Sequence, residues 1–291
     1  RMPLVFLVLS ACLNVVLDLI LIINFKMGVA GAAWATNLSQ AISAVLCAVY
    51  IYKKVPALMP EKLHWRFHKG DTRYQLATGI PMALQFAITS SGTMVMQSAI
   101  NLFGSEAVAA YTAAGKIHGL LTQGMVAMGQ TMAVYSGQNY GKGDAGRIRQ
   151  GVRAALIIEV IYSVASAVVV SAALGPSLGL FFSGEVDLAA MMPWARTYTT
   201  ICTLFYVPLC TIFIFRNTMQ GCGYGFLPMM GGVVELAARL IVAVIAMDIH
   251  SYWLACACDP AAWVGAGLFT GISYLYVIKK IEKNLGKGTA V

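Results

Sequence analysis

Charged side chains are scarce in this sequence. Lys, Arg, Asp and Glu together make up 11% of its 291 residues, whereas 59% of the residues are hydrophobic. A typical soluble domain carries about 25% charged residues. The mean hydropathy of +0.73 points in the same direction. The composition therefore argues against a water-soluble fold.

Motifs for metal, redox and nucleotide chemistry are also missing from the sequence. The seven cysteines are scattered, mostly within apolar runs, and lack the paired spacing of a zinc site, so we expect them to pack in the core. Cys256 and Cys258 alone fall near a predicted outer loop. The glycine-rich stretch 141–144 lacks the Walker spacing of a phosphate loop. We therefore expect no cofactor, and any transport would draw on an ion gradient or run downhill.

Long apolar runs, by contrast, recur along the whole chain. A helix needs about 20 apolar residues to cross the ~30 Å hydrocarbon core of a bilayer. The sequence therefore predicts an all-α membrane protein, a polytopic helical bundle. Its eight predicted spans cover residues 3–25, 29–52, 74–103, 107–135, 150–175, 194–220, 226–248 and 261–279.

The positive charges of the chain gather on one side of these spans. Lys and Arg concentrate at Arg1, in the connector 53–73, and in stretches 142–153 and 279–287. By the positive-inside rule the connector and the C-terminus are cytoplasmic, and the protein is expected in the inner (plasma) membrane. The net charge of +8 is thus a topology signal, and we expect no nucleic-acid binding. The loops on the opposite side hold Glu106, Glu185, Asp187, Asp248 and Asp259.

The first and last helix pairs resemble each other in sequence. The stretch 15–19 resembles 233–236 when Asp18 is aligned with Glu235. The stretch 32–35 likewise resembles 261–264, and each copy ends in a pair of lysines. Because both copies run in the same direction, the repeat is parallel, as in transporters built from two lobes.

This repeat predicts the organisation of the chain. Residues 1–52 would be the last two helices of an N-terminal lobe, 53–73 a cytoplasmic amphipathic connector, and 74–291 a six-helix C-terminal lobe with a basic tail. If both lobes have six helices, four further helices are expected upstream of Arg1. The expected full-length protein therefore has twelve helices and is expected to act as a monomer.

Several short motifs are spread over nearly the whole chain: Gly28-Val-Ala-Gly-Ala-Ala-Trp-Ala-Thr36, Gly79-Ile-Pro81, Ala109-Ala-Tyr111, Ser136-Gly-Gln-Asn-Tyr-Gly141 with Arg147-Ile-Arg149, and Gln220-Gly-Cys-Gly223. In this order they resemble the multidrug and toxic compound extrusion (MATE) family. The resemblance implies two six-helix bundles around a central cavity, with this chain starting at the fifth helix. It also implies antiport of organic cations against protons or sodium.

The resemblance implies a cation-coupling site at Asn14, Asp18 and Thr36. These residues match the family's Asn-x-x-x-Asp pair on the fifth helix and its Thr on the sixth. Asn14 and Asp18 share a helical face, so their oxygens can converge on a proton or a sodium ion, the only metal that we expect. A plain polar contact between helices is the alternative. A second-lobe sodium site of the kind known in the family is not expected, because the stretch 89–91 is Thr-Ser-Ser.

Other polar residues within the spans suggest a cavity and an ion pair. Glu235 and Arg239, at i and i+4, are predicted to form a structural ion pair, with substrate binding as the alternative. Glu159 would attract a cationic drug or carry a proton. Flexible methionines and polar side chains suit promiscuous binding. The predicted substrate cavity comprises Gln85, Met96, Gln97, Tyr111, Gln123 and Glu159.

The leading functional hypothesis is a secondary active multidrug exporter. Its partners would be small organic cations as substrates, exchanged for protons or sodium, and membrane lipid around it. A lipid-linked oligosaccharide flippase of the same superfamily is the nearest alternative. The alternative of another class, a multi-span membrane enzyme, is disfavoured because the four histidines, at positions 64, 68, 118 and 250, do not converge.

Overall fold

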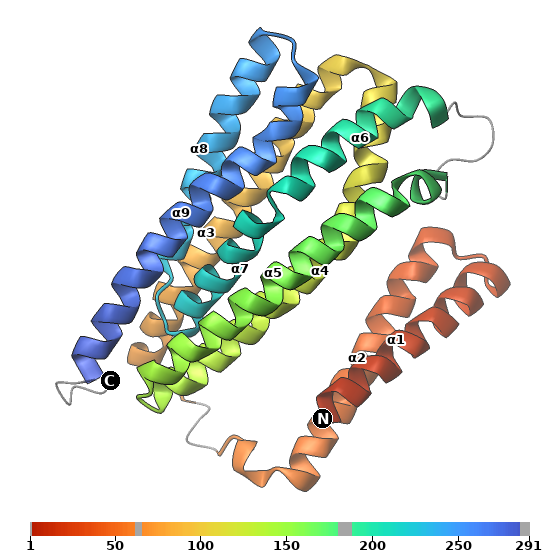
Figure 1. The fold of residues 1–291 in the computed structure, drawn as a ribbon. Helices are drawn as coiled ribbons and strands as arrows, with labels where there is room; N and C mark the ends of the chain where they lie inside the picture. Colours follow the sequence, from red (N-terminus) through yellow and green to blue (C-terminus); the bar gives the residue numbers. More distant parts are fainter. Residues whose placement is uncertain (1, 62–65, 180–187, 286–291) are drawn as a thin grey trace. The chain divides into compact units, whose positions relative to one another are not determined.

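The computed structural model describes residues 2–61, 66–179 and 188–285, which form helices and turns with no strand among them (Figure 1). The chain divides into two compact units, Arg1–Lys69 and Gly70–Val291. The all-α prediction is confirmed for these residues.

The first unit is a helical hairpin. Helix α1 (Met2–Leu19) continues as a short π-helix, η1 (Ile20–Asn24), and α2 (Gly28–Lys54) packs antiparallel against it. The window within residues 4–24 has a mean hydropathy of 2.7, and none of it is buried inside the protein. Such an apolar, outward-facing surface is stable in lipid, where the backbone hydrogen bonds are already satisfied within each helix.

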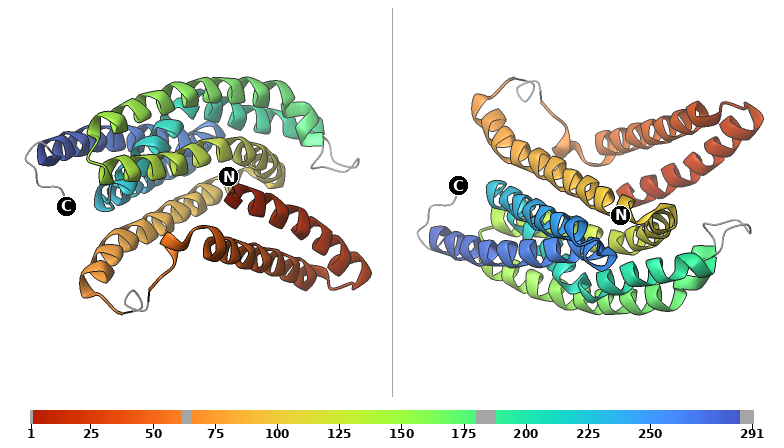
Figure 2. Two further views of the ribbon diagram at one scale, coloured as in Figure 1. Left: turned by 90° about the horizontal axis from the view of Figure 1, so that it is seen from below. Right: turned by 90° about the horizontal axis from the view of Figure 1, so that it is seen from above.

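In its described residues, the second unit is a bundle of seven α-helices, α3 to α9, drawn from yellow-orange to blue in Figure 2. Helix α4 packs against α5, α6 and α7, and α9 packs against α8 and α7. Two clusters of buried apolar side chains form its core, the larger one around Met125, Ile201 and Tyr206. The helices are α3 (Lys69–Ile100), α4 (Ser105–Gly141), α5 (Ala145–Gly179), α6 (Leu188–Leu204), α7 (Tyr206–Gly221), α8 (Phe226–Asp248) and α9 (Tyr252–Leu285).

Each of the eight predicted spans is helical where the structure describes it, but not all are equally apolar. By length and composition five helices could cross a membrane, or six if α6 and α7 are one bent span. Helices α3 and α4 fall outside this set. Several of their polar side chains, among them Gln85, Thr89 and His118, line cavities of the second unit, and this polarity lowers the mean hydropathy of both helices.

The predicted span 194–220 is divided into α6 and α7, which meet at an angle of 50°. Pro208 explains the break, because proline has no N–H to donate to the carbonyl four residues earlier and its ring clashes with that group. That carbonyl belongs to Leu204, where α6 ends. The helix resumes from the carbonyl of Phe205, which accepts a hydrogen bond from the N–H of Leu209 at 3.2 Å.

The last helix begins earlier than the sequence predicted. Helix α9 starts at Tyr252 rather than near residue 261. The prediction that Cys256, Cys258 and Asp259 lie in or near an outer loop is therefore wrong. All three side chains are buried in the helix. Asp259 precedes Pro260, a pair that is typical of turns. Here Pro260 is accommodated near the N-terminal end of a long helix.

The basic connector 53–73 is not one continuous helix. Helix α2 ends at Lys54, a single 3-10 turn follows at Pro56–Leu58, and α3 begins at Lys69. Part of the predicted amphipathic segment, residues 62–65, lies outside the described residues, as do residues 286–291 of the basic tail.

Helices α4 and α7 approach each other closely through two glycines. A Cβ atom at Gly221 would lie 2.1 Å from the backbone oxygen of Ala133, and one at Gly137 would lie 2.9 Å from the backbone oxygen of Gly221. Small residues allow this kind of approach between membrane helices, which gain most of their packing energy from close backbone contact.

We predict that Gly221→Ala destabilises the protein by about 1–3 kcal/mol, because the methyl group would force the two backbones apart. Thermal unfolding in detergent measures the effect. The control is Gly79→Ala in α3, where an added Cβ meets no atom within 4 Å. Equal unfolding temperatures for the two variants would contradict the proposed contact.

Candidate functional site

The first unit brings its three predicted coupling residues to one place on the hairpin. The side-chain amide of Asn14 donates a hydrogen bond to the hydroxyl of Thr36 across the two helices, at 3.4 Å. Asp18 lies one turn further along α1, and its Oδ1 atom is buried with no hydrogen-bond partner among the described residues. The group thus offers carboxylate, amide and hydroxyl oxygens, which suit a proton or a hard cation.

The backbone next to Asp18 is also unusual. The π-helix at Ile20–Asn24 begins two residues after it. Such segments are rare within α-helices and are frequent at functional sites. Elsewhere, the described residues contain no group of three or more His, Cys, Asp or Glu side chains that could hold a metal ion.

The second unit contains a cluster of four charged side chains on α7, α8 and α9, which we call the charge cluster: Glu235, Arg239 and Asp259 are buried, and the Arg216 side chain is 12% exposed. The guanidinium of Arg239 lies 2.9 Å from a carboxylate oxygen of Glu235 and 2.7 Å from one of Asp259. The second oxygen of Glu235 lies 3.7 Å from a guanidinium nitrogen of Arg216. Two guanidinium groups and two carboxylates make the cluster neutral overall.

Local sequence explains how these charges are held. Glu235 and Arg239 are one turn apart on α8, so they face the same side of the helix. A Cβ at Gly92 of α3 would lie 2.7 Å from Nη1 of Arg239, so only glycine admits the guanidinium at this point. The guanidinium of Arg216 lies over the ring of Phe213, 5.4 Å from its centroid, in a cation–π contact.

Two cavities adjoin the charge cluster. The first, of about 500 Å³, is lined by all four charged residues, by hydroxyl groups of α3 and by the rings of Tyr198 and Trp263; we call it the charged cavity. The second, of about 430 Å³, is lined by the side-chain amides of Gln85, Gln130, Asn217 and Gln220; we call it the amide cavity. The cavities share four lining residues, Gln85, Phe86, Phe213 and Arg216.

An aromatic group forms another wall of the charged cavity. The hydroxyl of Tyr206 contacts Nδ1 of His118, and the ring of Tyr198 packs edge-on against His118 at 5.2 Å. The imidazole is 6% exposed, and its Nε2 atom has no hydrogen-bond partner within the described parts of the chain. A polar atom left without a partner in a buried wall is unusual, because burial without a hydrogen bond is costly.

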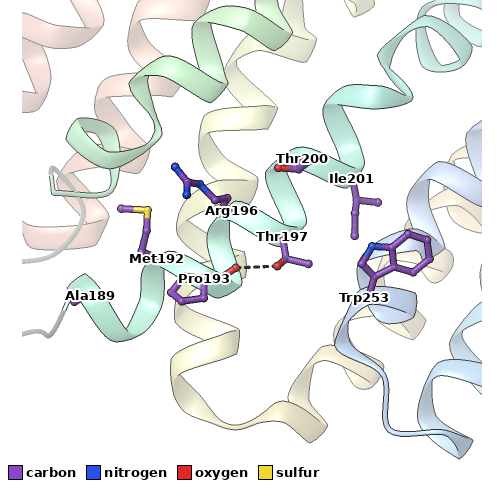
Figure 3. A pocket seen from close by; sticks show the side chains of 8 residues that line it. All are labelled: Ala189, Met192, Pro193, Arg196, Thr197, Thr200, Ile201 and Trp253. Carbon is purple, nitrogen blue, oxygen red and sulfur yellow. Dashed lines mark hydrogen bonds between the residues drawn. The ribbon is translucent and has the colours of Figure 1, made fainter.

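A third hollow, of about 730 Å³, lies on α6 (Figure 3). Among the described residues, all but one of those that line it come from this helix, with Trp253 of α9 facing Ile201 across it. The hydroxyl of Thr197 donates a hydrogen bond to the Pro193 carbonyl of its own helix at 2.9 Å and is therefore already satisfied.

Comparison with known proteins identifies the chain. The family model MatE matches residues 81–245, more than half of the chain. The chain belongs to the MATE family. Among curated MATE relatives, the probable multidrug resistance protein YpnP of Bacillus subtilis is 32% identical over 150 residues, covering 51% of this chain and 33% of that protein. The probable multidrug resistance protein NorM of Thermotoga maritima is 24% identical over 277 residues, covering 91% of this chain and 56% of that protein.

Solved MATE structures share the fold of this chain. A MATE transporter in a bent conformation has a TM-score of 0.84 at 19% identity, covering 97% of this chain and 62% of that chain. An outward-facing multidrug resistance MATE transporter has a TM-score of 0.81 at 20% identity, with the same coverage. This MATE chain thus spans between a third and two thirds of the relatives that it matches.

The residues predicted to form the substrate cavity lie in different surroundings in this MATE chain. Gln85 lines both cavities and accepts a hydrogen bond from the side chain of Gln220 at 2.8 Å. Met96 is buried in the larger core cluster, with Tyr111 packed against that cluster. Gln97 donates a hydrogen bond to Asn101.

The other two predicted cavity residues differ sharply in exposure. Gln123 is exposed, whereas Glu159 is 3% exposed, and its Oε2 atom has no hydrogen-bond partner in the described residues. Neither residue lines the charged cavity or the amide cavity. Their part in a substrate cavity stays a prediction.

The sequence missed three members of the site. The sequence analysis placed Asp259 in an outer loop and gave Arg216 and His118 no part in a site, yet all three line the charged cavity. The predicted ion pair of Glu235 and Arg239 is present, but it belongs to a larger cluster. One signal in the sequence could have found the cluster. Unpaired charges in lipid are costly, so charged side chains within or beside apolar segments are expected to pair with charges of the opposite sign.

We predict that Arg239→Met destabilises the protein by about 3–5 kcal/mol, because it leaves two buried carboxylates without their shared partner. Thermal unfolding in detergent measures this loss. The control is Arg149→Met, whose ion pair with Glu282 has side chains 42% and 38% exposed. That variant should lose only about 0–1 kcal/mol. A loss no larger in Arg239→Met than in the control would show that the charge cluster does not support the fold.

Proposed function

We propose that the complete protein is a secondary active exporter of amphipathic organic cations, driven by exchange for protons or sodium. It acts as a monomer in the inner (plasma) membrane, with the connector 53–73 and the C-terminus in the cytoplasm. The MATE membership and the multidrug resistance names of the relatives support this proposal. This chain covers 33% and 56% of those two relatives, so the activity is proposed for a protein of their full length and not for these 291 residues alone.

The observation that carries the coupling role is the position of Asp18. A carboxyl group in an apolar helix is costly unless it binds a proton, a cation or a polar partner. Asp18 has a buried oxygen with no hydrogen-bond partner in the part of the chain that the structure describes, beside an Asn14–Thr36 hydrogen bond that joins the two helices. Binding of a proton or sodium at Asp18 would change this polar contact and could shift the hairpin between two arrangements.

The charge balance of the second unit disfavours the flippase alternative. A pyrophosphate-linked sugar would need a surplus of cations in the cavity, whereas the two guanidinium groups of the charge cluster are matched by two carboxylates. A membrane enzyme is disfavoured by the scattered histidines: His118 is buried on α4, and His250 lies in the turn after α8.

We predict that Asp18→Asn in the complete protein abolishes ion-coupled efflux without affecting membrane insertion. Asn keeps the size of the side chain but cannot ionise, so efflux of a cationic dye should fall at least about ten-fold. The assay uses proteoliposomes with an imposed proton or sodium gradient, at matched protein content.

The matched comparison is Glu235→Gln, the corresponding change in the second copy of the repeat. This variant should respond to the ion gradient, even if its affinity for the dye is altered. Gradient-driven efflux that survives in Asp18→Asn but is lost in Glu235→Gln would contradict the assignment and place coupling in the second unit.

The substrate class is tested separately. We predict that the purified protein binds cationic dyes and not anionic lipid-linked sugars, because buried carboxylates attract cations strongly where the dielectric is low. Equilibrium binding of one probe of each kind, over a range of salt concentrations, measures the preference. Binding of the anionic lipid together with indifference to the dye would favour the flippase.

A further inference from the structure

The positive and negative charges that line the charged cavity cancel each other. The cavity contains two carboxylates, but two guanidinium groups of the protein already neutralise them. An organic monocation that enters therefore gains no net Coulomb attraction while both arginines stay in place. It can pair with one of these carboxylates only if one arginine withdraws.

The geometry shows which arginine that is. Arg239 forms two close contacts, at 2.9 Å to Glu235 and 2.7 Å to Asp259, and its side chain is 5% exposed. Arg216 contacts only Glu235 among the described acidic residues, and at 3.7 Å that contact is longer than a hydrogen bond. The weak member of the cluster is therefore Arg216.

A second polar environment, the amide cavity, also adjoins Arg216. This arginine is one of the four residues that line both the charged cavity and the amide cavity. On the other side of it, Gln130, Asn217 and Gln220 present side-chain amides. Amide oxygens can accept hydrogen bonds from a guanidinium group, which has five donors. A rotation of the long Arg216 side chain would thus exchange one polar environment for another.

We propose that the carboxylate of Glu235 is a binding point for an organic monocation within the charged cavity, and that Arg216 is a tethered internal cation that competes for it. In one state Arg216 neutralises Glu235 and excludes the ligand. In the other, Arg216 lies among the amides, the charged cavity has a net charge of −1, and the ligand replaces the guanidinium. This inference rests on the proposed substrate class, but it does not depend on the coupling role of Asp18.

The remaining walls suit such a ligand. Tyr198, Tyr206 and Trp263 provide aromatic faces, which attract cations with delocalised charge and an apolar body. The Nε2 atom of His118, buried without a partner in the described residues, leaves one polar position in the same wall for a group on the ligand or a water molecule. The site therefore favours flat or aromatic monocations over small hydrated ions.

Equilibrium binding of tetraphenylphosphonium to the complete, purified protein tests the proposal. This probe has a fixed charge, so its own protonation does not complicate the result. Arg216→Gln should tighten binding at least about five-fold, since it removes the competing charge, and Glu235→Gln should weaken binding by a similar factor. In the double variant the gain from Arg216→Gln should disappear, because both effects act through the same carboxylate.

The control is Arg149→Gln, which removes an arginine from a half-exposed ion pair distant in sequence from both cavities and should change affinity less than about two-fold. Size-exclusion profiles and unfolding temperatures establish that each variant is folded. If Glu235→Gln does not fold, two variants of Arg216 still test the proposal. Tighter binding of the probe to Arg216→Gln, together with wild-type binding to Arg216→Lys, supports the competition. Unchanged or weaker binding in folded Arg216→Gln overturns it.

Failure of the proposed function gives a different pattern. If the protein binds the probe with the predicted changes but does not export it under any gradient, the internal competition stands and the exporter assignment falls. If export depends on Asp18 while the Arg216 and Glu235 variants bind the probe as the wild type does, the exporter assignment stands and the competition falls.

Discussion

The second unit depends on keeping charge out of contact with lipid. Arg239 lies between carboxylates from α8 and α9, so one guanidinium group neutralises both of them and joins the two helices. Gly92 of α3 and Phe213 of α7 complete the surroundings of the two arginines. Helix α4 contributes His118 to the same cavity. Five helices of the MATE chain, α3, α4, α7, α8 and α9, therefore surround these polar groups, and the charged cavity lies between them.

The sequence predicted the helices well because their signal is local. Runs of apolar residues bounded by charge, Gly or Pro predicted helices at all eight positions, and the break at Leu204 follows from the chemistry of Pro208. The start of α9 was wrong for a related reason. Asp259-Pro260 is typical of a turn, and only tertiary contact with Arg239 makes a buried helical position favourable for that carboxylate.

The site was less predictable, because its members come from distant parts of the chain. The Glu235–Arg239 pair could be found, since i and i+4 positions meet on any helix. The approach of Arg216, Asp259 and His118 to that pair depends on how α4, α7, α8 and α9 pack, and no local pattern encodes it. The Asn14–Asp18–Thr36 group was found through family resemblance, and a polar contact at 3.4 Å now joins two of its members.

The glycine contact between α4 and α7 has a consequence for motion. Two backbones that touch without intervening side chains cannot slide past each other without a clash, so α4 and α7 should behave as a single rigid body. The backbone of the walls that α4 and α7 provide then keeps its shape, although side chains on it can still rotate. The described lining of the amide cavity comes from α3, α4 and α7, so a change in its overall shape would have to come from a movement of α3.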